Sequence, residues 1–592
     1  MVSQIYLVLI SLAAILLVHR SLRYFSNRSN HLPLPPGPPG LPLIGNLHQA
    51  PKSRVWAQWH AWAKEYGPVV YLNMLGQPLV ILNSAKAAQD LLARRGAIYS
   101  DRPRLVLAGE LALKGLHLLL MPYDAQYKAS SYRPLLHLES RQLLSNILKE
   151  SKKSPQGQGQ GQGQGQEQQA RSQQQQQQQQ QGVNHHHQLE RATASTTYAL
   201  IYGYRLLTGH EPEHARAHEI QKQFAAMMVG PNLVDLVPCL QGLPFPWPWK
   251  ARAERHFREQ RDLHLANLHR ALDNSGWNFA KEMAASAERG QMGEEEFAFD
   301  LGILADAALE TTVISASWFV VAWLAHGGGT GTGTTGTTGF VAKAQRCLDD
   351  VVGRDRLPDF DDRPRLPYID AIVEEVLRWR PIGTTGVPHL TKVEDRYEGR
   401  RIPAGSIVFA NQWAIARDVE VFGEDVDDFV PERWLVDGAG AAAGDGTGGG
   451  GGGENGGDDV TTDGGDKEEK SSNSEDCGAG SGLRDLPSIG FGFGRRACTG
   501  RYVARSVLWI QIAMLLWAFD LEGAVSRETG EKVEVDPMAM TDSLVIRPVP
   551  FDVLFKARGP WVEEVIQKQC DTLDVDLVDL LDKIGDYRAS RP

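Results

Sequence analysis

The longest apolar pattern inside the chain runs from Asp300 to Ala325, and no proline interrupts it. Apolar residues occupy every side of this stretch, which predicts a buried central helix. Glu310, Thr311 and Thr312 break the pattern near its middle. A buried carboxylate is costly unless it is paired or relays protons, so the pattern predicts a proton-handling group there. A core helix with threonines bonded back to its own carbonyls is the structural alternative.

A second apolar run opens the chain, from residue 2 to residue 18. As a helix it would span about 25 Å, against about 30 Å for the apolar core of a bilayer. His19, Arg20, Arg23 and Arg28 follow it, and no acidic residue precedes Glu65. This asymmetry predicts a single-pass signal anchor over residues 1–24, with the rest of the chain in the cytosol. A cleaved signal is disfavoured because a basic leading region and a small-residue cleavage site are missing.

Residues 25–45 contain the proline-rich stretch Leu32–Pro42. Fixed φ angles and missing N–H donors disfavour a helix here and predict a stiff, extended hinge between the anchor and a folded domain. Composition alone also allows a solvated linker or a ligand for a proline-binding module.

Three low-complexity tracts look like insertions, at residues 156–187, 327–339 and 437–482. None carries enough apolar residues to form a core. The three histidines 185–187, beside a glutamine tract, are expected to be solvated rather than to chelate a metal. Without the tracts, residues 46–556 are consistent with one large domain.

Residues 386–390, 397–411 and 413–418 read as short strands separated by glycine turns. Residues 557–592 form an acidic C-terminal tail that reads as an amphipathic helix.

A charged pair lies at the end of another predicted helix, where Glu375 and Arg378 are one turn apart. Such a pair alone is most often a surface salt bridge worth less than about 1 kcal/mol. Arg433 follows in the stretch Phe-Val-Pro-Glu-Arg-Trp and would complete a network in which two guanidinium groups clamp one carboxylate. We expect this network to be structural rather than catalytic.

The most specific chemistry lies in the glycine-rich segment Phe491–Gly500, which holds Cys498 just before an apolar run. Glycines allow backbone N–H groups to approach the sulfur, and the start of the following helix favours the thiolate. Arg496 adds positive charge nearby. The other cysteines show no C-x-x-C spacing, so a zinc site finds no support. An inert buried thiol is the alternative.

This segment resembles the F-x-x-G-x-R-x-C-x-G signature of the cytochrome P450 family, and Phe491, Gly494, Arg496, Cys498 and Gly500 fill its fixed positions. The resemblance implies the cytochrome P450 fold, which is mainly α with a smaller β-rich part, and haem b as the cofactor. Cys498 would then bind the iron as its axial ligand, and Arg496 would bind a haem propionate. It is similar in particular to fungal members such as the O-methylsterigmatocystin oxidoreductase-like enzymes.

The central helix resembles the family's A/G-G-x-D/E-T motif through Ala307-Ala-Leu-Glu-Thr. By that resemblance Thr311 steadies bound oxygen and Glu310 begins the proton relay. The usual second glycine is Ala308, which implies a tighter groove.

A third motif of the family, W-R-x-x-R, has only a degraded counterpart. Tyr127, Lys128 and Arg133 stand in its place and would bind a propionate, with a plain surface helix start as the alternative.

The family resemblance implies a haem-thiolate monooxygenase that inserts one oxygen atom into a lipophilic small molecule, as in secondary metabolism. The anchor would place it in the endoplasmic reticulum membrane. The chain shows no convincing dinucleotide fingerprint, so an NADPH-dependent flavoprotein reductase would supply electrons. Arg495, Arg501 and Arg505 would form either its docking patch or an ordinary basic face. The net charge of −11 argues against nucleic acid as a partner. An isomerase or dehydratase on the same fold, and an impaired haem or scaffold protein, are the alternatives.

Overall fold

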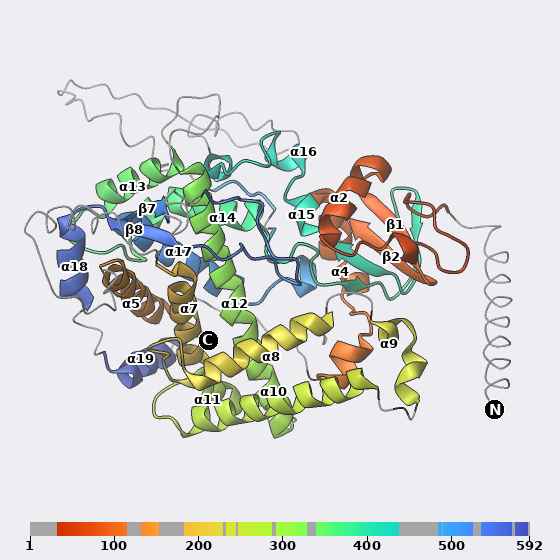
Figure 1. Ribbon diagram of the computed structural model, residues 1–592, viewed down its shortest axis with the longest axis horizontal. Helices are drawn as coiled ribbons and strands as arrows, with labels where there is room; N and C mark the ends of the chain where they lie inside the picture. Colours follow the sequence, from red (N-terminus) through yellow and green to blue (C-terminus); the bar gives the residue numbers. More distant parts are fainter. Residues whose placement is uncertain are drawn as a thin grey trace, which may run out of the picture.

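The computed structural model describes residues 32–114, 116, 132–152, 183–228, 232–243, 245, 247–286, 290, 292–327, 339–436, 483–487, 489–524, 534–570 and 575–589. Helices dominate this part of the chain (Figure 1). The main helices are α2 (Val55–Tyr66), α5 (Arg133–Ser151), α7 (His185–Tyr202), α8 (Pro212–Met228), α10 (Pro248–Asp273), α11 (Phe279–Ala284), α12 (Glu294–His326), α13 (Phe340–Val351), α14 (Pro367–Trp379), α17 (Arg501–Ala518), α18 (Pro560–Cys570) and α19 (Leu577–Ala589).

Shorter helical segments connect them. These are η1 (Leu47–Gln49), α3 (Ala85–Ala88), η2 (Gln89–Arg94), α4 (Gly96–Tyr99), η3 (Val106–Leu111), α9 (Leu233–Leu236), η6 (Pro238–Gly242), η8 (Arg363–Arg365), α15 (Gln412–Ile415), α16 (Val419–Phe422), η9 (Pro431–Trp434) and η10 (Gly494–Arg496). The predicted fold class, mainly α with a smaller β-rich part, is confirmed.

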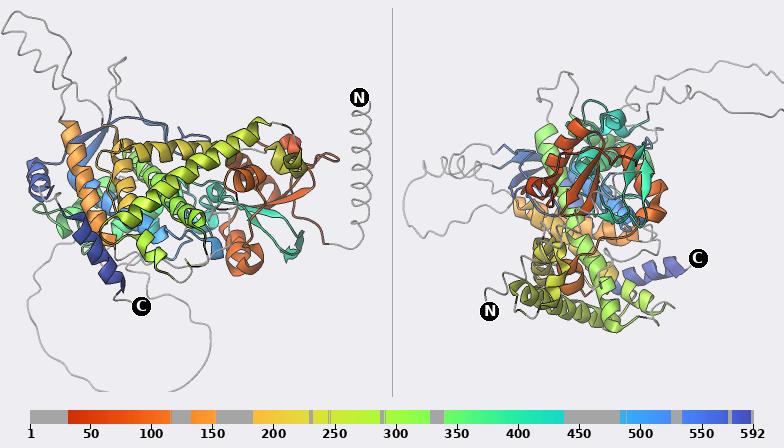
Figure 2. Two further views of the ribbon diagram at one scale, coloured as in Figure 1. Left: turned by 90° about the horizontal axis from the view of Figure 1, so that it is seen from below. Right: turned by 90° about the vertical axis from the view of Figure 1, so that its right-hand side faces the viewer.

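The β-rich part contains three small sheets. The strands are β1 (Val69–Met74), β2 (Gln77–Leu82), β3 (His389–Leu390), β4 (Asp395–Tyr397), β5 (Arg400–Ile402), β6 (Ile407–Ala410), β7 (Phe519–Gly523) and β8 (Val553–Ala557). The largest sheet has the order β1-β2-β6-β3. The two-residue turn Leu75-Gly76, with positive φ at both residues, closes the β1–β2 hairpin. Figure 2 (left) shows this sheet at one end of the molecule and most of the helices at the other.

The core is organised around α12, which runs through the middle of the molecule (Figure 1). It packs against α7, α10, α14 and α17. Apolar residues cover all its sides, and Trp318, Phe319 and Val320 have no accessible surface. Within the described residues α12 is the one helix long and apolar enough to span a membrane, but most of it is buried inside the protein. It is therefore the predicted central helix, six residues longer at its start than the apolar run.

The proline-rich hinge is tied to strands of two sheets, β1 through Tyr71 and β5 through Arg401. Tyr71 N–H donates to Pro36 O, and Arg401 N–H donates to Pro33 O, both at 2.9 Å. A Cβ at Gly37 would lie 2.1 Å from Tyr71 O, so only glycine allows this approach. The second half of the hinge is thus part of the folded domain rather than a free linker. The predicted anchor, residues 1–24, lies outside the described residues.

Two sequence predictions were wrong in detail. Residues 413–418 do not form a strand, because Gln412–Ile415 is the short helix α15, with Trp413 and Ile415 buried. Histidines 185–187 do not belong to a solvated tract, because they form the first turn of α7 and His185 is only 3% exposed. The tract predicted at 156–187 therefore ends before these histidines.

Candidate active site

The cysteine loop is a tight hairpin-like turn that leads directly into α17. Cys498 N–H donates to Phe491 O at 2.7 Å, which closes the loop. Gly492 and Gly494 have φ of +71° and +59°. A Cβ on Gly494 would lie 2.1 Å from Leu92 O in η2, so this glycine lets the loop pack against the neighbouring backbone.

The sulfur of Cys498 lies at the start of α17, where backbone N–H groups converge. The N–H groups of Gly500 and Arg501 both donate to it, as the sequence predicts for a held thiolate. A Cβ on Gly500 would have this sulfur as its nearest neighbour, at 3.8 Å. Cys498 is solvent-accessible, which leaves its sulfur free to bind a ligand.

The electrostatics of this thiol correct one expectation. Crowding by protein atoms raises the pKa of Cys498, against the opposing effects of the two N–H groups, Arg501 and Arg505. A metal ion bound at the sulfur would act in the opposite direction, because a coordinating thiol is deprotonated. The nearby cations are Arg501 and Arg505 rather than the predicted Arg496.

Arg496 instead belongs to a cluster with Arg102 and His389, in which both arginines are half-buried and the histidine is buried. Its Nε donates to Ser100 O at 2.7 Å. Burial lowers the pKa of Arg102 to about 10, and the positive charge of Arg496 contributes. Burial also lowers the pKa of His389 to about 4, with further contributions from Arg102 and Arg496. Asp101 is the carboxylate that acts on Arg496.

This cluster holds two arginine charges close to one carboxylate, Asp101. Arg102 donates to Pro388 O at 2.7 Å, and His389 Nδ1 lies 2.8 Å from Tyr99 O, so backbone carbonyls hold both side chains in place. Buried cations are retained where an anion or hydrogen bonds compensate them. The set therefore fits an acidic cofactor close to the cysteine loop. Sequence reasoning found Arg496 but missed Arg102 and His389.

The degraded third motif is only partly described. Tyr127 and Lys128 lie outside the described residues. Arg133, at the start of α5, is exposed, and its guanidinium lies 5.5 Å from the ring centre of Phe360. It lines a surface cavity of about 380 Å³ with Phe360, Arg363 and Asp370. No described contact joins Arg133 to Arg496, so its predicted role in propionate binding finds no support in this geometry.

The middle of α12 contains both a back-bonded threonine and a paired carboxylate, the two alternatives that its sequence offers. Thr311 Oγ1 donates to Ala307 O at 2.9 Å, which is the back-bonded geometry, and its lone pairs remain available as acceptors. Ala307 is exposed, and Ala308 and Thr311 are half-buried, whereas most residues of this helix are buried. Glu310 is ion-paired with His218 and Arg547. Burial opposes its ionisation, but these two cations lower the pKa of Glu310 overall.

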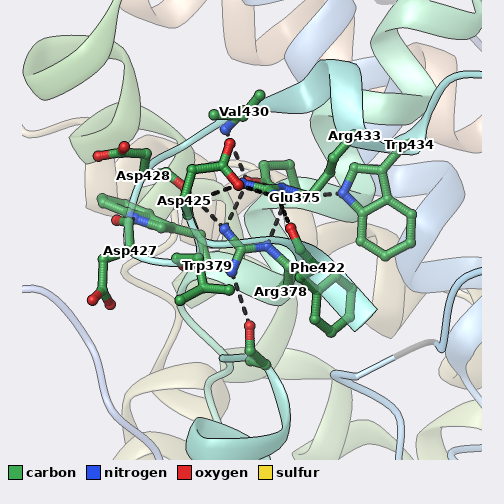
Figure 3. A network of polar contacts seen from close by, with 12 residues as sticks. Glu375, Arg378, Trp379, Phe422, Asp425, Asp427, Asp428, Val430, Arg433 and Trp434 are labelled. Atoms are coloured by element: carbon green, nitrogen blue, oxygen red, sulfur yellow. Dashed lines mark hydrogen bonds and ion pairs between the residues drawn. The ribbon is translucent and has the colours of Figure 1, made fainter. Parts of the chain in front are cut away.

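The predicted structural network is present in full (Figure 3). Glu375 and Arg378 have no accessible side-chain surface, and their two-pronged contact has distances of 2.7 and 2.8 Å. Arg433 Nε donates to Glu375 Oε1 at 3.1 Å. Val430 N–H and Trp434 Nε1 donate to the same carboxylate, both at 2.9 Å.

Arg378 extends this network to the chain that precedes the cysteine loop. It donates to the carbonyls of Ala416, Val426 and Asp428 at 2.7 to 2.9 Å. The network thereby fixes residues 416–434 against α14. This is the structural role that the sequence predicts.

Comparisons with known proteins agree with this geometry. The model of the family described as "Cytochrome P450" matches residues 35–555. Cytochrome P450 monooxygenase FrzL of Cladobotryum sp is 31% identical over 95% of both chains. Cytochrome P450 monooxygenase aneD of Aspergillus aculeatus is 34% identical over 90% of both chains. Cytochrome P450 monooxygenase peniB of Penicillium patulum is 31% identical over 93% of this chain and 90% of its own.

Proposed function

The chain belongs to the cytochrome P450 family and is a haem monooxygenase, and from that premise we propose that it inserts one oxygen atom of dioxygen into a lipophilic fungal secondary metabolite. Electrons come from an NADPH-dependent flavoprotein reductase. A segment at residues 1–24 anchors the enzyme in the endoplasmic reticulum membrane, with the catalytic domain in the cytosol. The finer likeness to O-methylsterigmatocystin oxidoreductase-like enzymes stays a prediction.

The observation that carries this proposal is the pairing of the Cys498 loop with two half-buried arginines, Arg102 and Arg496. Haem supplies oxidising power when a thiolate binds its iron, since thiolate ligation favours O–O cleavage. Cys498 is the proposed ligand, with its sulfur held by the N–H groups of Gly500 and Arg501. Arg102 and Arg496 are the proposed partners of the propionates.

The remaining residues have separate roles in the proposal. Glu310 and Thr311 handle protons and oxygen on α12. Glu375, Arg378 and Arg433 hold the segment before the cysteine loop. Segments 105–120, 382–387 and 540–544 occupy places where this family lines its substrate pocket, and the apolar character of segment 105–120 supports a lipophilic substrate.

The direct test is the spectrum of the reduced protein under carbon monoxide. We expect the red-shifted band of thiolate-ligated haem in the wild type and its loss in Cys498→Ser. Cys239→Ser is the matched control, because Cys239 is the other free, exposed cysteine among the described residues. A wild type without this band, or a Cys498→Ser variant that keeps it, contradicts the proposal.

NADPH dependence tests the reaction class. A monooxygenase consumes NADPH and dioxygen through its reductase. An isomerase or dehydratase on the same fold turns over its substrate without either.

A further inference from the structure

Glu310 lies in a cluster of charged side chains that come from four separate segments. Its Oε1 is 3.2 Å from His218 Nδ1 on α8, and its Oε2 is 2.9 Å from Arg547 Nη2. The other ring nitrogen of His218, Nε2, lies 2.7 Å from Glu190 Oε1 on α7. His218 therefore bridges two carboxylates.

The two cations on Glu310 differ in their chemistry. An arginine does not give up its proton in a protein, so Arg547 can only hold the carboxylate in place. A histidine titrates, and hydrogen bonds to Glu190 and Glu310 raise the pKa of His218 to about 10. His218 is thus charged at neutral pH and carries a transferable proton on the nitrogen that faces Glu310.

The position of His218 also gives it access to solvent. Its side chain is 36% exposed, whereas that of Glu310 is 20% exposed. Asp306, one turn earlier on α12, is the competing acid, and burial raises its pKa to about 7. Two of its partners, Gln260 and His264, are only 3% and 1% exposed, which leaves them poorly placed to exchange protons with water. The third, Gln221, is a neutral amide and cannot act as an acid.

We propose that His218 is the positioning residue that supplies protons to Glu310, and that Glu190 orients its ring for this transfer. The inference rests on the proposed function of Glu310 in proton delivery. In the step, the Nδ1–H bond of His218 breaks and the proton forms a bond to Glu310 Oε1. His218 becomes neutral and keeps its Nε2–H, which Glu190 holds. Glu310 becomes a neutral acid, passes its proton on, and His218 regains one from solvent.

Other charged groups near His218 set the pH range of the step. His214 stacks on His218 with ring centres 5.6 Å apart and lies 3.1 Å from Glu190. His186 and Arg547 also face the cluster. Because Arg547 keeps its charge and burial lowers the pKa of His186, His218 is the group whose titration controls the transfer above neutral pH.

The test uses the full-length enzyme with its reductase, NADPH and dioxygen, without added substrate. Two reactions compete: NADPH + O2 + H⁺ gives NADP⁺ + H2O2, and 2 NADPH + O2 + 2 H⁺ gives 2 NADP⁺ + 2 H2O. Water formation needs more proton deliveries. We expect His218→Gln to raise the peroxide formed per NADPH several-fold. His218→Lys keeps a charged N–H donor, so its peroxide yield should lie between those of the wild type and His218→Gln.

A matched control removes a different histidine–glutamate pair. His269 lies 2.9 Å from Glu294, where α10 meets the start of α12, and both are exposed. His269→Gln should leave the peroxide yield unchanged. In a Glu310→Gln background, His218→Gln should add nothing. For the wild type, the peroxide yield should rise as the pH approaches about 10, and this rise should disappear in His218→Gln.

Thermal unfolding gives a readout that does not depend on turnover. His218→Gln and Glu310→Gln should each lower the midpoint, and the double variant should fall less than the sum of the two. An unchanged peroxide yield in His218→Gln overturns the inference, whatever happens to the midpoint. A wild type that lacks the carbon monoxide band overturns the proposed function instead.

Discussion

At the scale of single residues, the Glu375 carboxylate shows how a buried charge organises a site. Two arginines, one backbone N–H and one indole N–H share it. Each donor loses its hydrating water on burial, and the hydrogen bond to the carboxylate offsets that desolvation cost. A change at Glu375 therefore acts on all of them together.

We expect Glu375→Gln to lower the free energy of unfolding by about 3–5 kcal/mol, because it leaves buried guanidinium charge uncompensated. Chemical denaturation measures this, and the haem content should fall with it. Glu398→Gln is the control: Glu398 is 54% exposed and pairs with the exposed Lys86, so its loss should cost less than about 1 kcal/mol. Equal effects of the two changes would contradict the structural role of the network.

Asp306 gives a prediction in pH. Burial raises its pKa to about 7 in the folded protein, above the ordinary value of 3.8. The stability it contributes is therefore fully present below pH 3.8 and is lost as the pH rises through about 7. We expect Asp306→Asn to flatten the fall of the thermal midpoint between pH 5 and pH 8, relative to the wild type. Parallel curves for the two proteins would show that Asp306 is not the group responsible.

The same residues show how far the sequence alone could go. Glu375 and Arg378 were predictable because helical spacing places them on one face, and Cys498 because its motif is contiguous. Arg102 and His389 were not, because 287 residues separate them in the chain and only the sheet brings them to Arg496. His218 was not predictable either, because the sequence of α8 contains no motif that identifies the residue in contact with Glu310.

At the scale of elements, periodicity predicted long helices better than short ones. The apolar run 300–325 gave α12 because its burial on every side needs no tertiary information. The segment 413–418 was read as a strand because alternating Trp, Ile and Arg suits one. The buried Trp413 packs on Trp56 of α2, with ring centres 4.2 Å apart, and this contact accompanies the helical turn α15. Tertiary packing overrides propensity in such short elements.

The acidic tail was predicted as one amphipathic helix, and it forms two helices, α18 and α19. Leu581 and Ile584 of α19 are buried against the body of the protein. Arg588 pairs with Glu282 and donates to Tyr132 OH at 2.7 Å. Because Tyr132 directly precedes α5, α19 ties the start of that helix to α11.

We expect deletion of residues 575–592 to lower the thermal midpoint and to speed proteolysis near the start of α5, because two buried apolar side chains and the Arg588 contacts are lost. Arg588→Gln should give the same change in smaller measure. Lys583→Gln is the control, since Lys583 makes an exposed pair with Asp579 on the same helix. If the truncated protein melted and was cleaved like the full chain, α19 would have no structural role.

At the scale of the whole molecule, the low-complexity tract 437–482 interrupts the sequence of a single fold, but the residues on either side of it still contact each other. The ends of the tract 437–482 meet in space: Leu435 pairs with Leu483 as an antiparallel bridge, and Arg484 N–H donates to Trp434 O at 2.8 Å. An insertion whose ends already touch adds little closure entropy to the folded domain, since that cost grows only slowly with loop length.

This geometry predicts that the tract can be removed. Replacing residues 437–481 with a two-residue Asn-Gly turn should keep the Leu435–Leu483 bridge, because such a turn joins paired antiparallel strands. The Glu375 network ends at Trp434, just before the bridge, and the cysteine loop begins soon after it. The shortened protein should therefore keep the carbon monoxide band and the haem content of the full chain. A second excision that also removes residues 432–436 is the control and should lose both, because it deletes Arg433 and Trp434. Loss of haem in the first protein would mean that the tract contributes to the site.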